Sequence, residues 1–221
     1  MISKNTLTFL SSLAQHNNRE WFESHKDEFR ALHEEFVAFG NEIAGEIARF
    51  DPAVRQHLLD PKTVKVFRIY RDARFSHDKR PYKTNFGLVI TPGGMERGAG
   101  VYYLHIEPGG SFVGGGLYRP SAAVLNRVRK RIASDHKKLR AILRAKTFKS
   151  VFGALSEGDM LKTAPRGISP EHPAIDLLKL KSFTAITGLR NADVTSPGLA
   201  KQVITVFKAI KPLNDFLSHG A

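Results

Sequence analysis

The fold is decided by residues 86–118, which read FGLVITPGGMERGAGVYYLHIEPGGSFVGGGLY. This stretch holds three segments rich in β-branched and aromatic residues, Phe86–Thr91, Val101–Glu107 and Ser111–Tyr118. A proline–glycine–glycine sequence follows each of the first two segments, and such sequences favour turns. The connections are too short for the helix that joins parallel strands, so the stretch predicts three consecutive antiparallel strands.

The rest of the chain adds two strands and several helices to this centre. Thr63–Tyr70 and Phe183–Thr187 have the same strand-like composition. From Arg19 to Phe50 the apolar residues recur every three or four positions, which predicts one uninterrupted helix about 45 Å long. Further helices are expected to end at Leu13 and to span 121–145, 170–181 and 196–217. These elements predict an α+β fold, in which long amphipathic helices pack on an antiparallel sheet of about five strands.

The overall composition is that of a globular protein. No internal repeat, low-complexity tract or linker is visible in the 221 residues, so residues 1–221 are expected to form a single domain. The absence of cysteine excludes a disulfide scaffold, a thiol nucleophile and an iron–sulfur centre. No apolar run approaches the roughly 18 residues of a membrane-spanning helix, and no secretory signal is visible. We therefore expect a cytoplasmic protein without a membrane partner.

The formal net charge of +13 is concentrated in two segments. Residues 65–83 carry seven basic and two acidic side chains, whereas residues 126–149 carry ten basic side chains and one acidic. Residues 1–50 are net acidic by contrast. The first basic segment is polar and loop-like, and the second has helical spacing. Both segments predict contact with anions.

In the first basic segment, several cations surround a short polar loop. Strand alternation places Phe67 and Ile69 toward the core, with Arg68 and Tyr70 on the opposite face. Guanidinium and ammonium groups bind phosphate or carboxylate oxygens, which predicts an anion site formed by Arg68, Arg71, Arg74, Lys79 and Lys83. Asp72 would orient these cations, and Tyr82, which follows Pro81, offers a hydroxyl donor. The alternative is a structural salt-bridge network with the acidic helix of residues 19–46, and the sequence leaves both open.

The same segment carries a resemblance to a known family. Residues 68–83 match the motif R-x-x-R-D-x-R-F-x-x-x-K-x-P-Y-K at every fixed position. The stretches 17–22, 114–118 and 172–183 look similar as well. The chain thus resembles a family of conserved bacterial and fungal proteins of unknown function. The resemblance implies a shared fold and a site at this motif, and it implies no reaction.

Three residues are candidates for proton chemistry. Alternation in the strand Val101–Glu107 places His105 and Glu107 on one face, where Glu107 could orient His105 as a general base. A hydrogen-bonded structural histidine is the other interpretation of His105. With Asp72 and Tyr82, His105 completes the candidate catalytic set. No metal-ligand cluster or cofactor motif accompanies them, so no cofactor is expected, and whether a reaction is catalysed stays open.

The second basic segment favours a different partner. A helix over residues 121–145 would expose a strongly basic face, which is typical of non-specific nucleic-acid binding. The side chains concerned are Arg127, Arg129, Lys130, Arg131, Lys137, Lys138, Arg140 and Arg144. Aromatic residues for base stacking are absent from this stretch except for Phe148. The sequence therefore leads to a small-molecule anion site, with nucleic-acid binding or a structural interaction protein as alternatives. It does not predict the oligomeric state.

Overall fold

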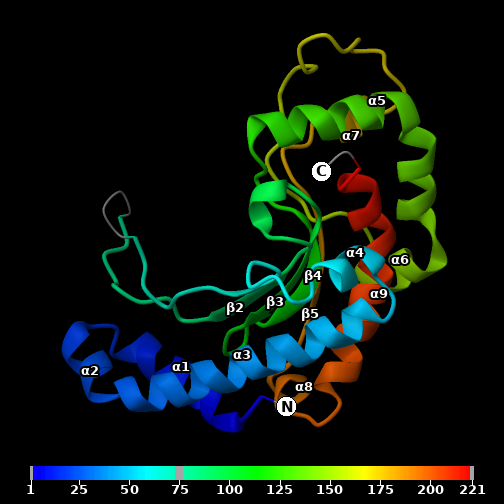
Figure 1. Ribbon diagram of the computed structural model, residues 1–221. Coiled ribbons are helices and arrows are strands. Elements are labelled where there is room, and N and C mark those ends of the chain that lie inside the picture. The colour runs from blue at the N-terminus through cyan, green and yellow to red at the C-terminus, as the bar shows by residue number, and fades with distance from the viewer. Residues whose placement is uncertain (1, 73–76, 220–221) are drawn as a thin grey trace.

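The computed structural model describes residues 2–72 and 77–219 (Figure 1). Its centre is a sheet of five antiparallel strands in the order β1-β2-β3-β4-β5. The strands are β1 (Val64–Val66), β2 (Phe86–Ile90), β3 (Val101–Ile106), β4 (Phe112–Leu117) and β5 (Phe183–Gly188). The predicted α+β class and the predicted antiparallel strands are confirmed.

Helices precede and follow the strands of this sheet. Before the sheet come α1 (Lys4–Gln15), α2 (Arg19–Ser24), α3 (Lys26–Ala48) and α4 (Pro52–Gln56). A short 3₁₀ helix, η1 (Met95–Arg97), follows β2. After β4 come α5 (Ala122–Arg144), α6 (Lys146–Phe152) and α7 (Ile175–Leu178), and after β5 come α8 (Asn191–Val194) and α9 (Leu199–Leu217). No helix in 2–72 or 77–219 is both long and apolar enough to cross a bilayer.

The long helices α3 and α9 pack against the same face of the sheet, as Figure 1 shows. The alternation of β3 explains why, since Tyr102, Leu104 and Ile106 are buried and the residues between them are only half-buried. On the core side, Phe36 of α3 lies 5.4 Å from Phe86 between ring centroids, and Phe207 of α9 lies 5.1 Å from Tyr102. We call the opposite face, which carries Tyr103 and His105, the outer face.

Several predicted helix boundaries are wrong. The expected helix from Arg19 to Phe50 is broken at His25, whose backbone angles (φ −114°, ψ 16°) are not helical. The helix expected over 170–181 is reduced to the four residues of α7, and Pro173 disfavours a helical conformation at His172, before α7 begins. The last helix begins at Leu199, after the expected Ser196 cap. The short helices α4 and α6 were not expected.

A basic hairpin extends from β1 and β2, and we use this name for residues 67–72 and 77–85. The strand expected over Thr63–Tyr70 stops at Val66, yet the two arms stay paired through a bridge between Tyr70 and Tyr82. The backbone N–H of Lys83 donates to the carbonyl of Ile69 (2.8 Å), and the N–H of Arg71 donates to Pro81 (2.8 Å).

One predicted face in this hairpin is wrong. Ile69 is buried as expected, but Phe67 lies on the outer face, where its ring centroid is 6.4 Å from that of Tyr103. The register explains this position, because Lys65 pairs with Val89 and the N–H of Phe67 donates to Gly87, so both face away from the core. A bend at Ile69 then restarts the alternation.

The side chain of Asn17 holds the hairpin against the helices. Its Nδ2 donates to the carbonyl of Tyr82 (3.0 Å), and its Oδ1 accepts from the N–H of Tyr82 (3.1 Å). The Tyr82 ring stacks on Phe22 of α2 with 4.0 Å between centroids. The neighbouring Asn18 instead caps α2 by accepting from the N–H of Trp21 (2.9 Å). Asn17 thus fixes the position of the hairpin, which extends beyond the same end of the sheet as α1 and α2 (Figure 1).

The Asn17→Ala variant should lose both hydrogen bonds to Tyr82. We expect the free energy of unfolding to fall by about 1–3 kcal/mol, because a part-buried backbone group loses its partner. Hydrogen exchange should accelerate at the Tyr82 amide in particular. Asn18→Ala is the matched control, since it should cost about 1 kcal/mol through the lost helix cap without a specific effect at Tyr82. Equal exchange at Tyr82 in the two variants would contradict the assignment.

Candidate functional site

A hollow of about 120 Å³ lies at the base of the basic hairpin, and we call it the hairpin hollow. Both arms of the hairpin contribute residues to the wall of the hollow, so the hollow forms only when the two arms are paired. Among the described residues, the hollow is lined by Arg71, Arg80, Tyr82, Lys83, Thr84 and Asn85. Three of these six, Arg71, Tyr82 and Lys83, were predicted as site residues from the sequence.

Asp78 organises the two arginines of the hollow. Arg71 forms an ion pair with Asp78 Oδ2. Arg80 donates hydrogen bonds to both carboxylate oxygens, from Nε to Oδ1 (3.0 Å) and from Nη2 to Oδ2 (2.7 Å). Bidentate arginine–carboxylate pairs of this kind have a strongly preferred geometry. The bonds from Arg80 and Arg71 hold the pKa of Asp78 far below its ordinary value. The carboxylate therefore stays charged at neutral pH and keeps both guanidinium groups beside the hollow.

Lys83 is the cation in the wall without such a carboxylate. Its ammonium lies 5.4 Å from the ring centroid of Phe67, and Lys65 lies 5.7 Å from the same ring. Among the described residues, no acidic side chain lies within ion-pair distance of Lys83. Burial, and then the nearby charge of Arg68, lower the pKa of Lys83. The hollow thus contains the half-buried ammonium of Lys83, whose charged form is disfavoured by burial and by Arg68.

Two other predicted anion-binding residues, Arg68 and Lys79, lie outside the wall. Arg68 and Lys79 are exposed and do not line the hollow, and Arg74 lies outside the described residues. Asp72, predicted to orient the arginines, is exposed, and the described contacts place Asp78 between Arg71 and Arg80 instead.

Tyr82 borders the hollow, and its ring packs against α2. Its side chain is buried with the ring stacked on Phe22. Burial, followed by the nearby hydroxyl of Tyr70, raises the pKa of Tyr82. The phenol is therefore neutral at physiological pH and is available as a hydrogen-bond donor. A role for Tyr82 in proton transfer stays a prediction.

His105 forms the middle of a hydrogen-bonded chain on the outer face. Its Nε2 lies 3.1 Å from Glu107 Oε2, and its Nδ1 lies 3.1 Å from the Tyr103 hydroxyl. Because an ionised carboxylate only accepts, Nε2 carries the proton and Nδ1 accepts from Tyr103. The ring also stacks on Phe112 with 4.5 Å between centroids. Both ring nitrogens are engaged, which favours the structural interpretation of His105, and its catalytic role stays a prediction.

Two residues of the hollow's wall connect it to this series of hydrogen bonds between Tyr103, His105 and Glu107, and the sequence analysis predicted neither of them. The Thr84 hydroxyl donates to Glu107 Oε1 (2.8 Å), and Asn85 Nδ2 lies 3.4 Å from His105 Nδ1. Their position directly after Lys83 was a usable signal, because residues that follow a binding motif into a strand share its surroundings. Asp78 and Arg80 lie within the basic segment itself, but their composition alone does not single them out as wall residues.

Half of the basic side chains of α5 that were predicted to bind nucleic acid contact other parts of the protein instead. Arg127 donates to the carbonyl of Gly98 and Arg140 pairs with Asp176 (2.7 Å). Arg129 donates to the carbonyls of Leu178 (2.9 Å) and Leu180 (3.2 Å), and Arg131 lies over the ring of Phe216. The remaining four, Lys130, Lys137, Lys138 and Arg144, are exposed. The charge of this helix is therefore partly structural, which weakens the argument for nucleic-acid binding.

Removing Arg129 should lower stability far more than removing its neighbour. Arg129→Ala leaves two carbonyls without a charged donor, so we expect a loss of about 1.5–3 kcal/mol in the free energy of unfolding. Lys130→Ala, the matched control with the same change of charge, should stay within about 0.5 kcal/mol of the wild type. Urea unfolding curves measure both variants. Similar stabilities for the two would mean that the Arg129 contacts contribute nothing.

Comparisons with other proteins identify the family. Residues 5–216 match the family described as conserved hypothetical protein DUF2461. No curated protein and no solved structure matches the chain. The matched residues include the described wall of the hairpin hollow, the hydrogen-bonded residues Tyr103, His105 and Glu107, and α5. It agrees with the expectation of a conserved family of unknown function, and this chain belongs to the DUF2461 family.

Proposed function

We propose that the hairpin hollow binds a phosphate or carboxylate group of a small molecule. The observation that carries the proposal is Lys83, a half-buried ammonium in the wall with no acidic partner among the described residues. Burying a charge without a partner is unfavourable, and a bound anion would supply the missing partner.

The other wall residues support an oxygen-rich ligand. Arg71 and Arg80 share the single carboxylate of Asp78, and each guanidinium has five N–H donors. Donors therefore remain for a ligand after the ion pairs to Asp78 are made. The amide of Asn85 adds a neutral N–H donor to the same wall. A volume of about 120 Å³ is well above the roughly 10–15 Å³ that one water molecule requires.

The structural alternative has support from Asp78, which joins Arg71 and Arg80 into a network within the hairpin. That network, however, leaves out Lys83, which is held only by its contact with Phe67 and the surrounding wall in the part of the chain that is described. A purely structural role predicts that replacing Lys83 by an apolar residue stabilises the protein. A binding role predicts that it abolishes the affinity for anions.

Replacing Lys83 should separate these roles. In Lys83→Met the chain keeps an apolar stem over Phe67 and loses the charge, so binding of inorganic phosphate should weaken at least tenfold. Lys201→Met on the exposed side of α9 removes the same charge and should bind as the wild type does. Isothermal titration at low and moderate salt measures the affinities. A pocket of few cations should retain its affinity at moderate salt better than a polyphosphate-binding surface does.

Two outcomes would contradict the proposal. One is a wild-type protein that binds neither phosphate nor acetate at millimolar concentration. The other is Lys83→Met with unchanged affinity, which would assign the binding to another surface such as α5.

The affinity should also depend on pH in a defined direction. A bound anion favours the charged form of Lys83, so the affinity should be full below the lowered pKa of Lys83 and should fall as the pH rises through it. Sulfate is the suitable probe, because its charge is constant over this range. Lys83→Arg keeps its charge at high pH and should flatten the profile. A profile that is equally steep in Lys83→Arg would rule out Lys83 as the titrating group.

A further inference from the structure

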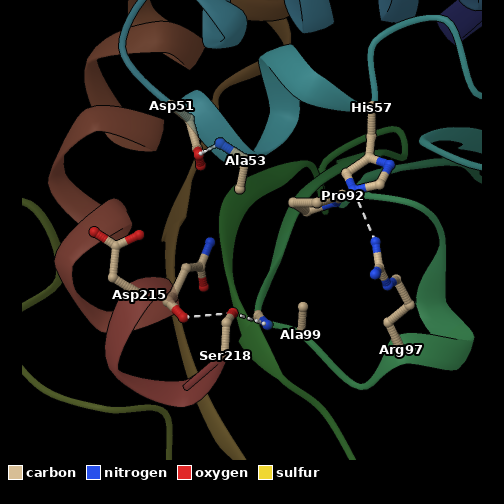
Figure 2. A pocket seen from close by; sticks show the side chains of 10 residues that line it. Asp51, Ala53, His57, Pro92, Arg97, Ala99, Asp215 and Ser218 are labelled. Atoms are coloured by element: carbon tan, nitrogen blue, oxygen red, sulfur yellow. Dashed lines mark hydrogen bonds between the residues drawn. The ribbon is translucent and has the colours of Figure 1, made fainter. Parts of the chain in front are cut away.

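A second cavity, of about 240 Å³, lies at the opposite end of β2 from the hairpin hollow. Three segments that are distant in the sequence form it: the first residues of α4, the stretch 92–100, and the end of α9. Figure 2 shows Asp51 and Asp215 on one side of this cavity, with His57 and Arg97 on the other. We call it the C-terminal cavity. Nothing in the sequence analysis selected these residues.

Buried polar side chains concentrate around this cavity. Six polar residues are buried in the described part of the chain, and four of them line the cavity or bond to its wall. Asp51 and Asn214 line it, Thr63 donates to the carbonyl of His57 (2.6 Å), and Thr91 donates to the carbonyl of Gly100 (3.4 Å). Burying polar groups is costly, and such a concentration at one place calls for a reason beyond the packing of a core.

Asp51 is a buried carboxylate without a cation. It is 5% exposed and accepts hydrogen bonds from the N–H groups of Ala53 (3.0 Å) and Val54 (3.4 Å) and from the hydroxyl of Tyr102 (2.7 Å). A carboxylate has about four acceptor positions, so one remains. Within 2–72 and 77–219 no lysine or arginine lies at ion-pair distance from Asp51. The negative charge is stabilised by neutral donors alone.

Asn214 adds a buried acceptor to the same wall. The side chain is 3% exposed, and its Nδ2 donates to the carbonyl of Val101 (3.1 Å). Because a carbonyl can only accept, the atom facing Val101 must be the nitrogen, which fixes the orientation of the amide. Its Oδ1 finds no hydrogen-bond partner among the described residues. This oxygen lies beside Gly100 in the wall, where a Cβ on Gly100 would come within 2.7 Å of it.

The remaining wall residues narrow the chemistry further. Asp215, exposed and paired with Lys211 (2.6 Å), adds a second carboxylate on the side of Asp51. His57 Nε2 is occupied by Arg97 Nη1 at 2.7 Å, which removes this nitrogen as a metal ligand. No group of three or more metal-ligating side chains is present among the described residues. The open positions are thus acceptors next to a buried negative charge.

From this geometry we propose that the C-terminal cavity binds the primary ammonium group of a small molecule at Asp51 and Asn214. An ammonium supplies three N–H donors and one positive charge, which match the free acceptor position of Asp51, Asn214 Oδ1 and the nearby Asp215. Arg97, across the cavity, would receive a carboxylate if the ligand carries one. This site is separate from the proposed anion site, about 20 Å away along β2, and does not depend on it.

Titration calorimetry with a matched set of small compounds tests the proposal. Ethylamine and glycine share the ammonium group, tetramethylammonium has the same charge without N–H donors, and acetate has neither. We expect saturable binding of ethylamine and glycine, and at least tenfold weaker binding of tetramethylammonium and acetate. Tighter binding of glycine would support the contact with Arg97, and equal binding would support a site for the ammonium alone. In amide spectra, the largest shifts should occur at Gly100 and the Asn214 side chain.

Variants locate the site. Asp51→Asn keeps an acceptor for the N–H groups of α4 and removes the charge, so the affinity for ethylamine should fall at least tenfold. Asp27→Asn, which removes one exposed carboxylate at the start of α3, is the control and should stay within twofold. If Asp51→Asn does not fold, Asp215→Asn and Ala53→Leu at the cavity wall replace it, and each should weaken binding at least threefold. The proposal is overturned if no primary amine binds, if tetramethylammonium binds equally well, or if these variants retain full affinity.

Discussion

The arrangement of the hairpin depends on one pair of hydrogen bonds, which joins the Asn17 amide to the backbone of Tyr82. An amide side chain presents one donor and one acceptor, so it pairs with a residue's N–H and C=O as a neighbouring strand would. Phe22 covers this contact by stacking on the Tyr82 ring. Because Lys83, Thr84 and Asn85 follow directly, fixing Tyr82 fixes one arm of the hairpin hollow. The other arm is held through the bonds to Pro81 and Asp78.

The sheet could be predicted from local pattern, whereas the hairpin could be predicted only in part. β2, β3 and β4 are joined by short connections, so their composition and turns determine the antiparallel order. Arg71, Tyr82 and Lys83 could be found because cations cluster there in the sequence. The face of Phe67 could not, because the bend at Ile69 interrupts the alternation. The role of Asn17 depends on a contact 65 residues away, which no local pattern reveals.

Net charge proved a weaker guide than the position of each charge. Arg127, Arg129 and Arg140 of α5 look like a solvent-exposed basic face in the sequence, but they bond to carbonyls of neighbouring segments. Long arginine side chains can cover apolar surface and still reach a polar partner, so a basic helix can serve as a structural clamp. By contrast, Asp51 and Asn214 carry no sequence signal and lie where three distant segments meet. The sequence therefore predicts part of the hairpin hollow at one end of β2, and none of the C-terminal cavity at the other end.

The central claim is that an oxyanion occupies the hairpin hollow, and crystals grown with selenate test it most directly. The anomalous difference map locates selenium without reference to any assumed site. The account predicts a peak in the hollow, with oxygens at hydrogen-bond distance from Lys83 and at least one of Arg71 and Arg80. Peaks confined to other surfaces, with the hollow lacking selenate at saturating concentration, would contradict the account.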